Sequence, residues 1–452
     1  MSIRKIGPAV FTLILFLFPG PASSQAGSPA GPIPPEVLEA RRQGLSEVLN
    51  GAPAILSSAG PRGDNAQDSD YRENNDFFYL TGLEAPGAWL VFNGGGEADA
   101  TLYLPPRSPT SERWTGPLLG PGDEARILTG LTQVRSTEDL EGDLLRWFRS
   151  RGDSAAPPFD TLLASFGDDR FEEVLEAFLP AGSLDRRALT PIMAGLRLVK
   201  DKEELRRLRR AVDITAEAHR ELWRVAEPGC TEYQLEGALE YVFKAQGAER
   251  VGFPSIVGSG PNSVILHYDK NRRRVEAGDL VVVDIGAEYG YYTADLTRTF
   301  PVDGHFSPRQ KALYDLVLGA REAGLEVIRP GGTMREVNRA VREFLETRSG
   351  DLCGESSCAP FLIHGVSHWL GMDVHDVGNG GSTFIPGMVL TLEPGLYLLE
   401  EELGIRIEDD ILVTETGHEV LSADLPRSSE EIEAIMGEEP QWVRSSSSGF
   451  RR

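Results

Sequence analysis

The spacing of apolar residues predicts long helices in the C-terminal half of the chain. After Asp201, apolar side chains recur near helical spacing at Leu205, Leu208, Val212 and Ile214. A stripe of this kind is typical of an amphipathic helix that buries one face. We therefore expect one long helix to begin at Asp201.

Three further helix starts are predicted by capping boxes, in which Ser or Thr is followed three residues later by Gln or Glu. The pairs are Thr231 with Gln234, Ser307 with Gln310 (followed by Pro308 at the first helical position), and Thr333 with Glu336. Two β-rich runs alternate with these helices. The order of helix pair, β-rich run, helix pair and β-rich run predicts a diverged internal duplication over about 195–437.

The first β-rich run, 280–300, contains Asp284 within an apolar strand and Asp295 eleven residues later. A hairpin that turns at Tyr289 and Gly290 would place Asp284 opposite Asp295. Two facing carboxylates repel, so one is protonated unless a cation lies between them. A hard divalent metal is the simplest such cation.

The second β-rich run, 388–415, repeats this arrangement with Glu393 and Glu408. Their midpoint falls at Glu400 and Glu401, so a turn there would bring the two carboxylates together. The sequence therefore predicts a second acidic hairpin.

Between the hairpins, the segment 364–376 contains His364, His368 and His375. Two Asp, two Glu and one of these His make a five-ligand, oxygen-rich set that suits Mn²⁺, Fe²⁺, Co²⁺ or Zn²⁺. Two such ions about 3.5–4 Å apart hydrolyse amides or esters without a protein nucleophile. Neither a G-x-S-x-G elbow nor an HExxH motif occurs, which leaves the serine-hydrolase and single-zinc alternatives unsupported.

Each acid also has a purely structural interpretation when it is taken alone. Asp295 would then pair with Arg298, and Glu408 would neutralise Arg406. Four acids in matched hairpins with a histidine between them favour a metal site over these separate ion pairs.

The N-terminal half predicts an α/β domain, because helices alternate there with β-runs. Its helices are expected at Pro35 to Leu49, 138–150 and 170–178, and its β-runs at 86–93 and 98–106. The predicted organisation is a signal peptide (1–26), a linker (27–36), an N-terminal domain (37–190), a catalytic domain (191–437) and a disordered tail (438–452).

The first 26 residues are typical of a secretory signal. Arg4 and Lys5 precede a short apolar stretch from Val10 to Phe18, and Ser24-Gln25-Ala26 is a cleavage tripeptide. The expected location is therefore secreted or periplasmic, with an uncleaved anchor as the alternative. No later segment approaches the roughly 20 apolar residues of a membrane span.

The net charge of −24 argues against nucleic-acid binding, which needs a basic surface. The three cysteines suggest neither a metal site nor a disulfide framework. In an exported protein, Cys353 and Cys358 could close a small loop, and Cys230 would be a buried free thiol.

The motifs around these residues resemble those of the pita-bread metallopeptidases of family M24, the group of methionine aminopeptidase, prolidase and aminopeptidase P. The matching segments are 253–268, 281–300, 364–378, 390–397 and 404–414. The Ser-His-Trp form of the histidine motif is most similar to bacterial aminopeptidase P. Segments 71–82 and 104–116 resemble the creatinase-like N-terminal domain of the same enzymes. The resemblance implies an α+β chain with a C-terminal pita-bread catalytic domain and an N-terminal creatinase-like α/β domain.

The resemblance also implies a role for each site residue. The metal ligands would be Asp284, Asp295, His368, Glu393 and Glu408, with Asp295 and Glu408 bridging two ions, usually manganese. Glu393 would also shuttle a proton. His267 and His375 would donate hydrogen bonds to the substrate, His364 would shape the pocket, and Arg406 would lie near the metal or the substrate.

The implied function is an Xaa-Pro aminopeptidase, which removes the N-terminal residue from peptides with proline second by means of a metal-bridging hydroxide. A prolidase that cleaves Xaa-Pro dipeptides is the alternative within the class. A non-catalytic peptide-binding relative is the alternative outside it, although such relatives lose ligands and this chain retains all five. Relatives are often dimers or tetramers, so a homo-oligomer is compatible with the resemblance.

Overall fold

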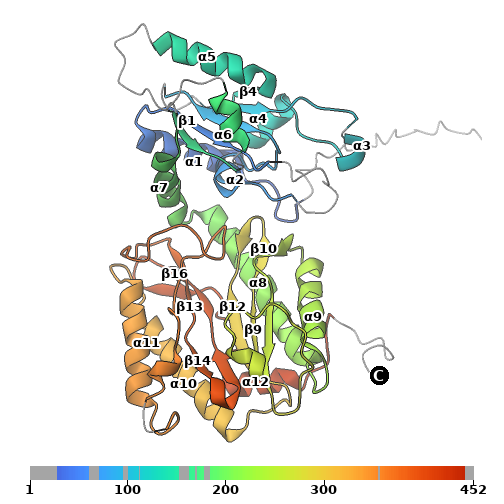
Figure 1. Ribbon diagram of the computed structural model, residues 1–452, viewed down its shortest axis with the longest axis vertical. Helices are drawn as coiled ribbons and strands as arrows, with labels where there is room; N and C mark the ends of the chain where they lie inside the picture. Colours follow the sequence, from blue (N-terminus) through green and yellow to red (C-terminus); the bar gives the residue numbers. More distant parts are fainter. Residues whose placement is uncertain are drawn as a thin grey trace, which may run out of the picture.

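The computed structural model describes residues 28–60, 71–94, 100–110, 112–151, 162–167, 170–177, 184–354 and 357–442. The predicted signal peptide, the first residue of the linker and most of the predicted tail (443–452) lie outside these ranges. Figure 1 shows two parts, an N-terminal α/β unit and a larger C-terminal unit. Mixed helices and sheets confirm the predicted α+β class.

The N-terminal unit is built on a six-stranded sheet with the order β4-β3-β2-β1-β5-β6. Strand β1 pairs antiparallel with β2 and parallel with β5, so the sheet is mixed. Its strands are β1 Ala54–Ser57, β2 Trp89–Phe92, β3 Ala100–Leu104, β4 Gln133–Ser136, β5 Leu162–Ser165 and β6 Leu184–Asp185. Its helices are α1 Pro35–Leu49, α2 Asn75–Thr81, α3 Glu112–Thr115, α4 Asp123–Thr129, α5 Leu140–Arg151, α6 Arg170–Glu176 and the 3₁₀ turn η2 Thr137–Asp139.

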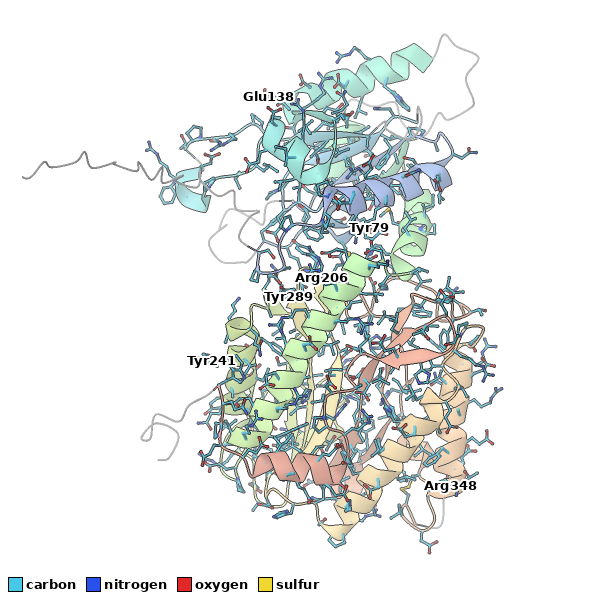
Figure 2. The ribbon with its side chains drawn as sticks, turned by 180° about the vertical axis from the view of Figure 1, so that it is seen from behind. Tyr79, Glu138, Arg206, Tyr241, Tyr289 and Arg348 are labelled. Carbon is cyan, nitrogen blue, oxygen red and sulfur yellow. A yellow bond between two sulfur atoms is a disulfide. The ribbon has the colours of Figure 1, made fainter. Side chains whose placement is uncertain are left out.

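Two helices join the units. Helix α7 Arg186–Leu198 contacts α1 and β5 of the N-terminal unit, and it runs across the predicted boundary between residues 190 and 191. Helix α8 Lys202–Val225 then begins the C-terminal unit, where Asp201 and Glu204 form a capping box. The predicted long helix is confirmed. Figure 2 shows Tyr79 of α2 and Arg206 of α8 near this junction.

The C-terminal unit repeats one motif, a helix pair beside a three-stranded antiparallel sheet. The first copy has the sheet order β12-β9-β8 and the second β13-β16-β17, in agreement with the predicted duplication. The helices are α9 Glu232–Ala245, α10 Pro308–Leu325, α11 Met334–Arg348, α12 Ser429–Met436 and the 3₁₀ turns η3 Gly260–Val264, η4 Ala359–Phe361 and η5 Leu399–Glu401. The strands are β7 Arg250–Val251, β8 Ile256–Ser259, β9 Leu280–Ile285, β10 Ala287–Tyr289, β11 Tyr292–Thr293, β12 Leu296–Pro301, β13 Val389–Leu392, β14 Gly395–Leu398, β15 Leu403–Arg406, β16 Asp409–Val413 and β17 His418–Val420.

All three predicted capping positions start helices. Thr231 and Ser307 have complete capping boxes. Thr333 accepts a hydrogen bond from the backbone N–H of Glu336, but the Glu336 carboxylate binds the Thr333 hydroxyl instead of its backbone. The reciprocal half of this box is therefore not formed, and the chain around Thr333 makes a β-bridge to Thr383.

The first acidic hairpin has a register different from the one predicted. It turns at Gly290 and Tyr291, both with positive φ, and Asp284 lies opposite Thr297 rather than Asp295. The shift comes from Tyr291, whose ring stacks on Phe78 of the N-terminal unit at 3.7 Å and fixes the turn one residue later. Asp295 and Thr297 are two residues apart, so Asp295 still shares a face with Asp284 as a diagonal neighbour.

The second acidic hairpin has the register predicted from its midpoint. Gly395 pairs with Arg406 and Leu392 with Asp409, which places Glu393 opposite Glu408 between the two ladders. The turn lies at η5, as expected.

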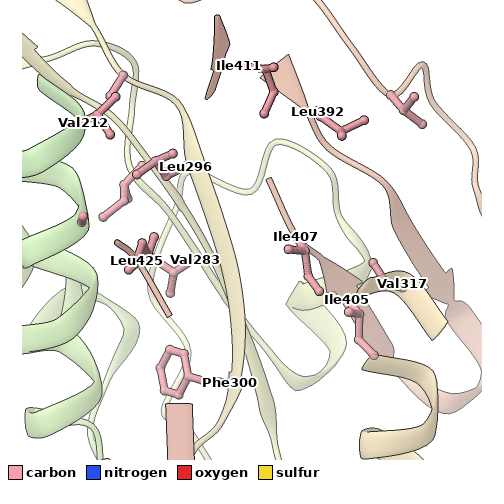
Figure 3. Packing of buried hydrophobic residues seen from close by; sticks show 14 of the residues in the cluster. Val212, Val283, Leu296, Phe300, Val317, Leu392, Ile405, Ile407, Ile411 and Leu425 are labelled. Carbon is pink, nitrogen blue, oxygen red and sulfur yellow. The ribbon is translucent and has the colours of Figure 1, made fainter. Parts of the chain in front are cut away.

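The apolar residues of both copies form one core around the hairpins, shown in close-up in Figure 3. Val283 and Leu296 come from the first hairpin, and Ile405 and Ile407 from the second, and all four are fully buried. This common core holds the two hairpins in a fixed relative position.

The cysteines differ in part from the prediction. Cys353 and Cys358 form a disulfide that closes the loop after α11. Cys230 is free but only half-buried, because it lies in the turn before α9 rather than inside the helix. Within the described part of the chain, no helix is both long enough and apolar enough to cross a bilayer.

Gly286 gives a test of the first hairpin. A Cβ atom there would lie 1.8 Å from the Ala294 carbonyl oxygen and 2.8 Å from the Phe253 ring. We expect Gly286→Ala to lower the free energy of unfolding by roughly 1–3 kcal/mol, the usual cost of overpacking. Gly195→Ala in α7, where a Cβ meets nothing within 4 Å, is the control and should be neutral or slightly stabilising. Equal stability of the two variants in urea would contradict the close packing at Gly286.

Candidate metal centre

All of the predicted site residues meet in one cavity of about 470 Å³. The cavity lies in the C-terminal unit, between the two acidic hairpins and the histidine segment. Its walls include the nine residues His267, Asp284, Asp295, His364, His368, His375, Glu393, Arg406 and Glu408.

The two hairpins supply the four carboxylates. Asp284 lies in β9 and Asp295 immediately before β12. Glu393 lies between the end of β13 and the start of β14, and Glu408 between the end of β15 and the start of β16. His368 is held beside them because its backbone N–H donates to the Thr391 hydroxyl and its carbonyl accepts from the Thr391 N–H. Residues from three distant segments are therefore fixed by β-sheet hydrogen bonds.

The ligand atoms are close enough to share ions. One atom each from Asp295, His368 and Glu408 lie within 4.8 Å of one another. His368 Nε2 is 3.3 Å from Asp295 Oδ2 and 3.7 Å from Glu393 Oε1. The spacing suits a site in which a cation replaces direct contact between these groups.

Unpaired oxygens show that the residues fit a divalent cation. Asp284 Oδ1, Asp295 Oδ1 and Glu408 Oε1 are buried without a hydrogen-bond partner in the described part of the chain. A buried carboxylate oxygen without a partner is costly, and a coordinated cation removes that cost. The chemistry of the set, four carboxylates and an imidazole, matches ions such as Mn²⁺.

Burial and mutual repulsion act on the same carboxylates. Burial, with repulsion from Glu408, raises the pKa of Asp295 well above its usual range. Burial and repulsion from Glu393 do the same to the pKa of Glu408. Burial raises the pKa of Glu393 to about 8. These carboxyl groups therefore ionise fully only when a positive charge is bound beside them.

Burial has the opposite effect on the histidines. It lowers the pKa of His368 to about 4 and that of His364 to about 4. A neutral imidazole is the form that binds a metal. His368 is therefore ready to act as a ligand at neutral pH.

Arg406 is tied to the first hairpin rather than to Glu408. Its guanidinium lies 2.6 Å from Asp284 Oδ2 and donates to the Tyr397 hydroxyl at 2.9 Å. The Tyr397 hydroxyl also lies 2.9 Å from His364 Nε2. This chain of contacts links Asp284 to His364 along the cavity wall.

The two structural interpretations of single acids are not observed. Arg298 pairs with Asp409 at 2.7 Å, on the far side of the strands, instead of with Asp295. Arg406 pairs with Asp284 instead of with Glu408. Asp295 and Arg298 are three residues apart and so face opposite sides of the strand, whereas Arg406 reaches across to Asp284 of the first hairpin.

The histidines expected to contact substrate are more exposed than the ligands. His267 and His375 both reach the cavity wall and remain solvent-exposed. The His375 ring lies 4.4 Å from the His368 ring, centroid to centroid. These positions allow both side chains to meet a molecule that enters the cavity.

Three polar residues of the site were not predicted as functional. Thr297 donates to Glu408 Oε2 at 2.7 Å, and Asp410 Oδ2 accepts from the backbone N–H of Asp295 at 3.1 Å. Both lie two residues beyond a predicted ligand and so face the same side, a signal that strand periodicity could have given. Tyr397 lies diagonal to Arg406 in the second hairpin, a neighbour that the predicted register gives, whereas its partner His364 is brought to it by the fold.

Comparison with known proteins was made from sequence and from structure. Residues 206–415 match metallopeptidase family M24, and residues 38–154 match the aminopeptidase P N-terminal domain. The chain is 37% identical to the Xaa-Pro aminopeptidase of Escherichia coli, over 88% of this chain and 97% of the relative. It is 33% identical to the Xaa-Pro aminopeptidase of Haemophilus influenzae, over 89% of this chain and 98% of the relative.

The folds agree as well. Aminopeptidase P from E. coli with the inhibitor Pro-Leu superposes with a TM-score of 0.79 at 36% identity, covering 90% of this chain and 99% of that one. Proline aminopeptidase P II from Yersinia pestis gives a TM-score of 0.78 at 36% identity, covering 89% and 99%. The predicted combination of a pita-bread domain with an aminopeptidase P N-terminal domain is confirmed.

The raised carboxylate pKa values predict a metal-dependent pH profile of stability. Glu393 has a pKa of about 8 when folded against an ordinary 4.5, so the folded state binds more protons than the unfolded state between these values. Its contribution to stability is therefore present below pH 4.5 and lost as pH rises through 8. A divalent ion favours the ionised form and cancels the loss.

We expect the Tm of metal-free protein to fall relative to that of protein with Mn²⁺ as pH rises from about 5 to 8. Glu393→Gln, which cannot ionise, should narrow the difference between the two forms. Parallel Tm profiles with and without the ion, measured by calorimetry, would contradict this account.

Proposed function

The chain belongs to metallopeptidase family M24, and we propose that it is a metal-dependent Xaa-Pro aminopeptidase that removes the N-terminal residue from peptides with proline second. The observation that carries the proposal is the convergence of five metal-binding side chains, three with unpaired buried oxygens, in one open cavity. The relatives named above support the proline specificity.

The residues of the centre would hold two divalent ions, and we propose Mn²⁺ because the donors are mainly carboxylates. When bound, such ions polarise a carbonyl and make water nucleophilic near neutral pH. Asp295 and Glu408, whose ligand atoms lie within 4.8 Å of each other and of His368, would be two of the ligands. Asp284, Glu393 and His368 would complete the set.

Glu393 is placed to move a proton. Its Oε2 lies 3.6 Å from His364 Nδ1, and burial raises its pKa to about 8. With positive charge present it would be ionised, and it would accept the proton of the attacking water and deliver it to the departing proline nitrogen. That nitrogen must gain a proton to leave as an amine, and it becomes the secondary amine of the new N-terminal proline.

The remaining cavity residues fit substrate binding. His267 and His375 would donate hydrogen bonds to the scissile carbonyl or to the substrate backbone. Apolar side chains beside them would accept the proline ring. These are Phe253, Pro254, Ile256, Leu266 and Val374.

We also propose that the protein is secreted or periplasmic after removal of residues 1–26, on the strength of the basic, apolar and small-residue order of that segment. N-terminal sequencing of protein exported by a bacterial host should begin at Gly27. A chain that keeps its first 26 residues in the membrane fraction would favour the uncleaved anchor.

The function is tested with a matched pair of substrates, an X–Pro–Y tripeptide and an X–Pro dipeptide, each incubated with the mature protein and Mn²⁺. Release of the first residue from the tripeptide is expected. Cleavage of the dipeptide alone would make the protein a prolidase. Cleavage of neither would favour a non-catalytic peptide-binding protein.

The ligand assignment is tested by Asp295→Ala and Glu408→Ala. Each should lower kcat/KM for the tripeptide by about three orders of magnitude or more, because ion-assisted polarisation contributes several kcal/mol. Each should also lower the metal content measured by elemental analysis. Glu400→Ala, which removes an exposed acid from the turn of the hairpin that carries Glu408, is the control and should keep both activity and metal. Full activity without bound metal in either ligand variant would contradict the assignment.

A further inference from the structure

The segment that carries His375 is bound by the N-terminal unit. Arg72 donates a hydrogen bond to the Met372 carbonyl at 2.7 Å. Asn75, the first residue of α2, donates to Asp373 Oδ2 at 2.7 Å. Arg72 and Asn75 of the N-terminal unit thus contact residues that lie three and two positions before His375.

Asp376, immediately after His375, anchors the other end of the segment. Its two carboxylate oxygens accept from Arg197 at 2.6 Å and from Lys200 at 3.1 Å. The same Arg197 guanidinium lies 2.8 Å from Asp76 of α2. A continuous series of ion pairs therefore runs from the N-terminal unit, through the helix that joins the units, to the residue beside His375.

These ion pairs are buried. The side chains of Lys200, Asp376 and Arg197 are 0%, 1% and 5% exposed. Asp373 also lies 3.5 Å from Arg197, so three acids surround the two bases, and removal of Asp76 would leave the buried Arg197 with one partner fewer.

The backbone around His375 has little freedom to rearrange. Asp376 donates its N–H to the Trp369 carbonyl at 3.0 Å, and Gly371 donates to the Asp373 carbonyl at 3.2 Å. A Cβ atom on Gly371 would lie 2.1 Å from Asp376 Oδ2, so the loop closes tightly on its own carboxylate. The position of His375 follows from where Asp376 and Asp373 are held.

We propose that the N-terminal domain positions His375 for catalysis through an interdomain clamp. The clamp consists of Arg72, Asn75, Asp76, Arg197 and Lys200 on one side and Met372, Asp373 and Asp376 on the other. Its members are positioning residues, because the clamp side chains do not line the cavity. The inference rests on the proposed function, in which His375 contacts the substrate.

Asp76→Asn is the variant that tests the clamp. The Asp76 side chain contacts Arg197 and, at 3.3 Å, the Ser165 hydroxyl, and it is not part of the cavity wall. The change keeps the shape of the side chain and removes its charge. Asn75→Ala, which removes the hydrogen bond to Asp373 and the one accepted from Arg72 and leaves the buried ion pairs in place, is a milder variant for use if Asp76→Asn does not fold.

A matched control is available in a second ion pair between the units. Arg41 of α1 lies 2.9 Å from Asp201 at the start of α8, and neither residue contacts the segment 369–378. Asp201→Asn weakens this pair and keeps a residue type suited to the helix N-cap. It removes a charge from an ion pair between the units whose side chains contact no residue of the clamp.

The first measurement is hydrogen exchange, followed by mass spectrometry of peptides that cover 369–378. We expect faster exchange in Asp76→Asn than in the unmodified protein, and no change in Asp201→Asn. Unchanged exchange in Asp76→Asn would overturn the clamp. The measurement needs no substrate, so it does not depend on the proposed function.

The second measurement is a double-mutant cycle on tripeptide hydrolysis. In the protein that retains His375, Asp76→Asn should lower kcat/KM roughly tenfold, since a small misplacement of a substrate-contacting group is costly. In a His375→Ala background it should have less than about a twofold effect, because the group that it positions is gone. Asp201→Asn should have the same small effect in both backgrounds.

An equal loss from Asp76→Asn in both backgrounds would show a purely structural role and would overturn the proposal. Failure of the proposed function has a different signature, the absence of X–Pro cleavage by the unmodified protein.

Discussion

The structure depends on carboxylates that are buried close together. A bound cation offsets their mutual repulsion and their loss of hydration. Asp295 and Glu408 are 4% and 1% exposed, and each keeps one buried oxygen without a partner in the described part of the chain. Leaving such groups charged and unpaired costs several kcal/mol. The fold accepts this cost because two hairpins, locked by a common apolar core, hold the acids where they cannot separate. The buried acids therefore lower the stability of the metal-free protein, but they form a metal site that is already assembled.

The charges that serve the fold are kept apart from those that serve the site. On one face of the strands, Arg298 and Arg321 share Asp409, which lowers the pKa of that buried acid below its usual range. On the other face, Arg406 is the single guanidinium among the described residues that line the cavity. Glu408 and Asp409 are adjacent in sequence and point to opposite faces. Glu408 therefore lines the cavity, whereas Asp409 forms the structural ion pairs. The excess of negative charge remains on the side where ions would bind.

Much of this arrangement could be predicted from the sequence, because it is local. Helix starts follow from capping residues, and the second hairpin from the midpoint between Glu393 and Glu408. The first hairpin was placed with the wrong register, since its turn is fixed by Tyr291 stacking on Phe78, more than 200 positions away in the chain. The Tyr397 contact with His364 and the interdomain clamp were missed for the same reason, whereas the Tyr397 contact with Arg406 lies within the second hairpin. Contacts between distant segments decide these features, and no spacing within a segment encodes them.

The most direct test of the central claim is a crystal structure of the protein soaked in Mn²⁺, with anomalous scattering recorded at the manganese edge. The account predicts two anomalous peaks among Asp284, Asp295, His368, Glu393 and Glu408, with Asp295 and Glu408 in contact with both. An absence of peaks at these residues, or a peak at another place on the protein, would contradict it.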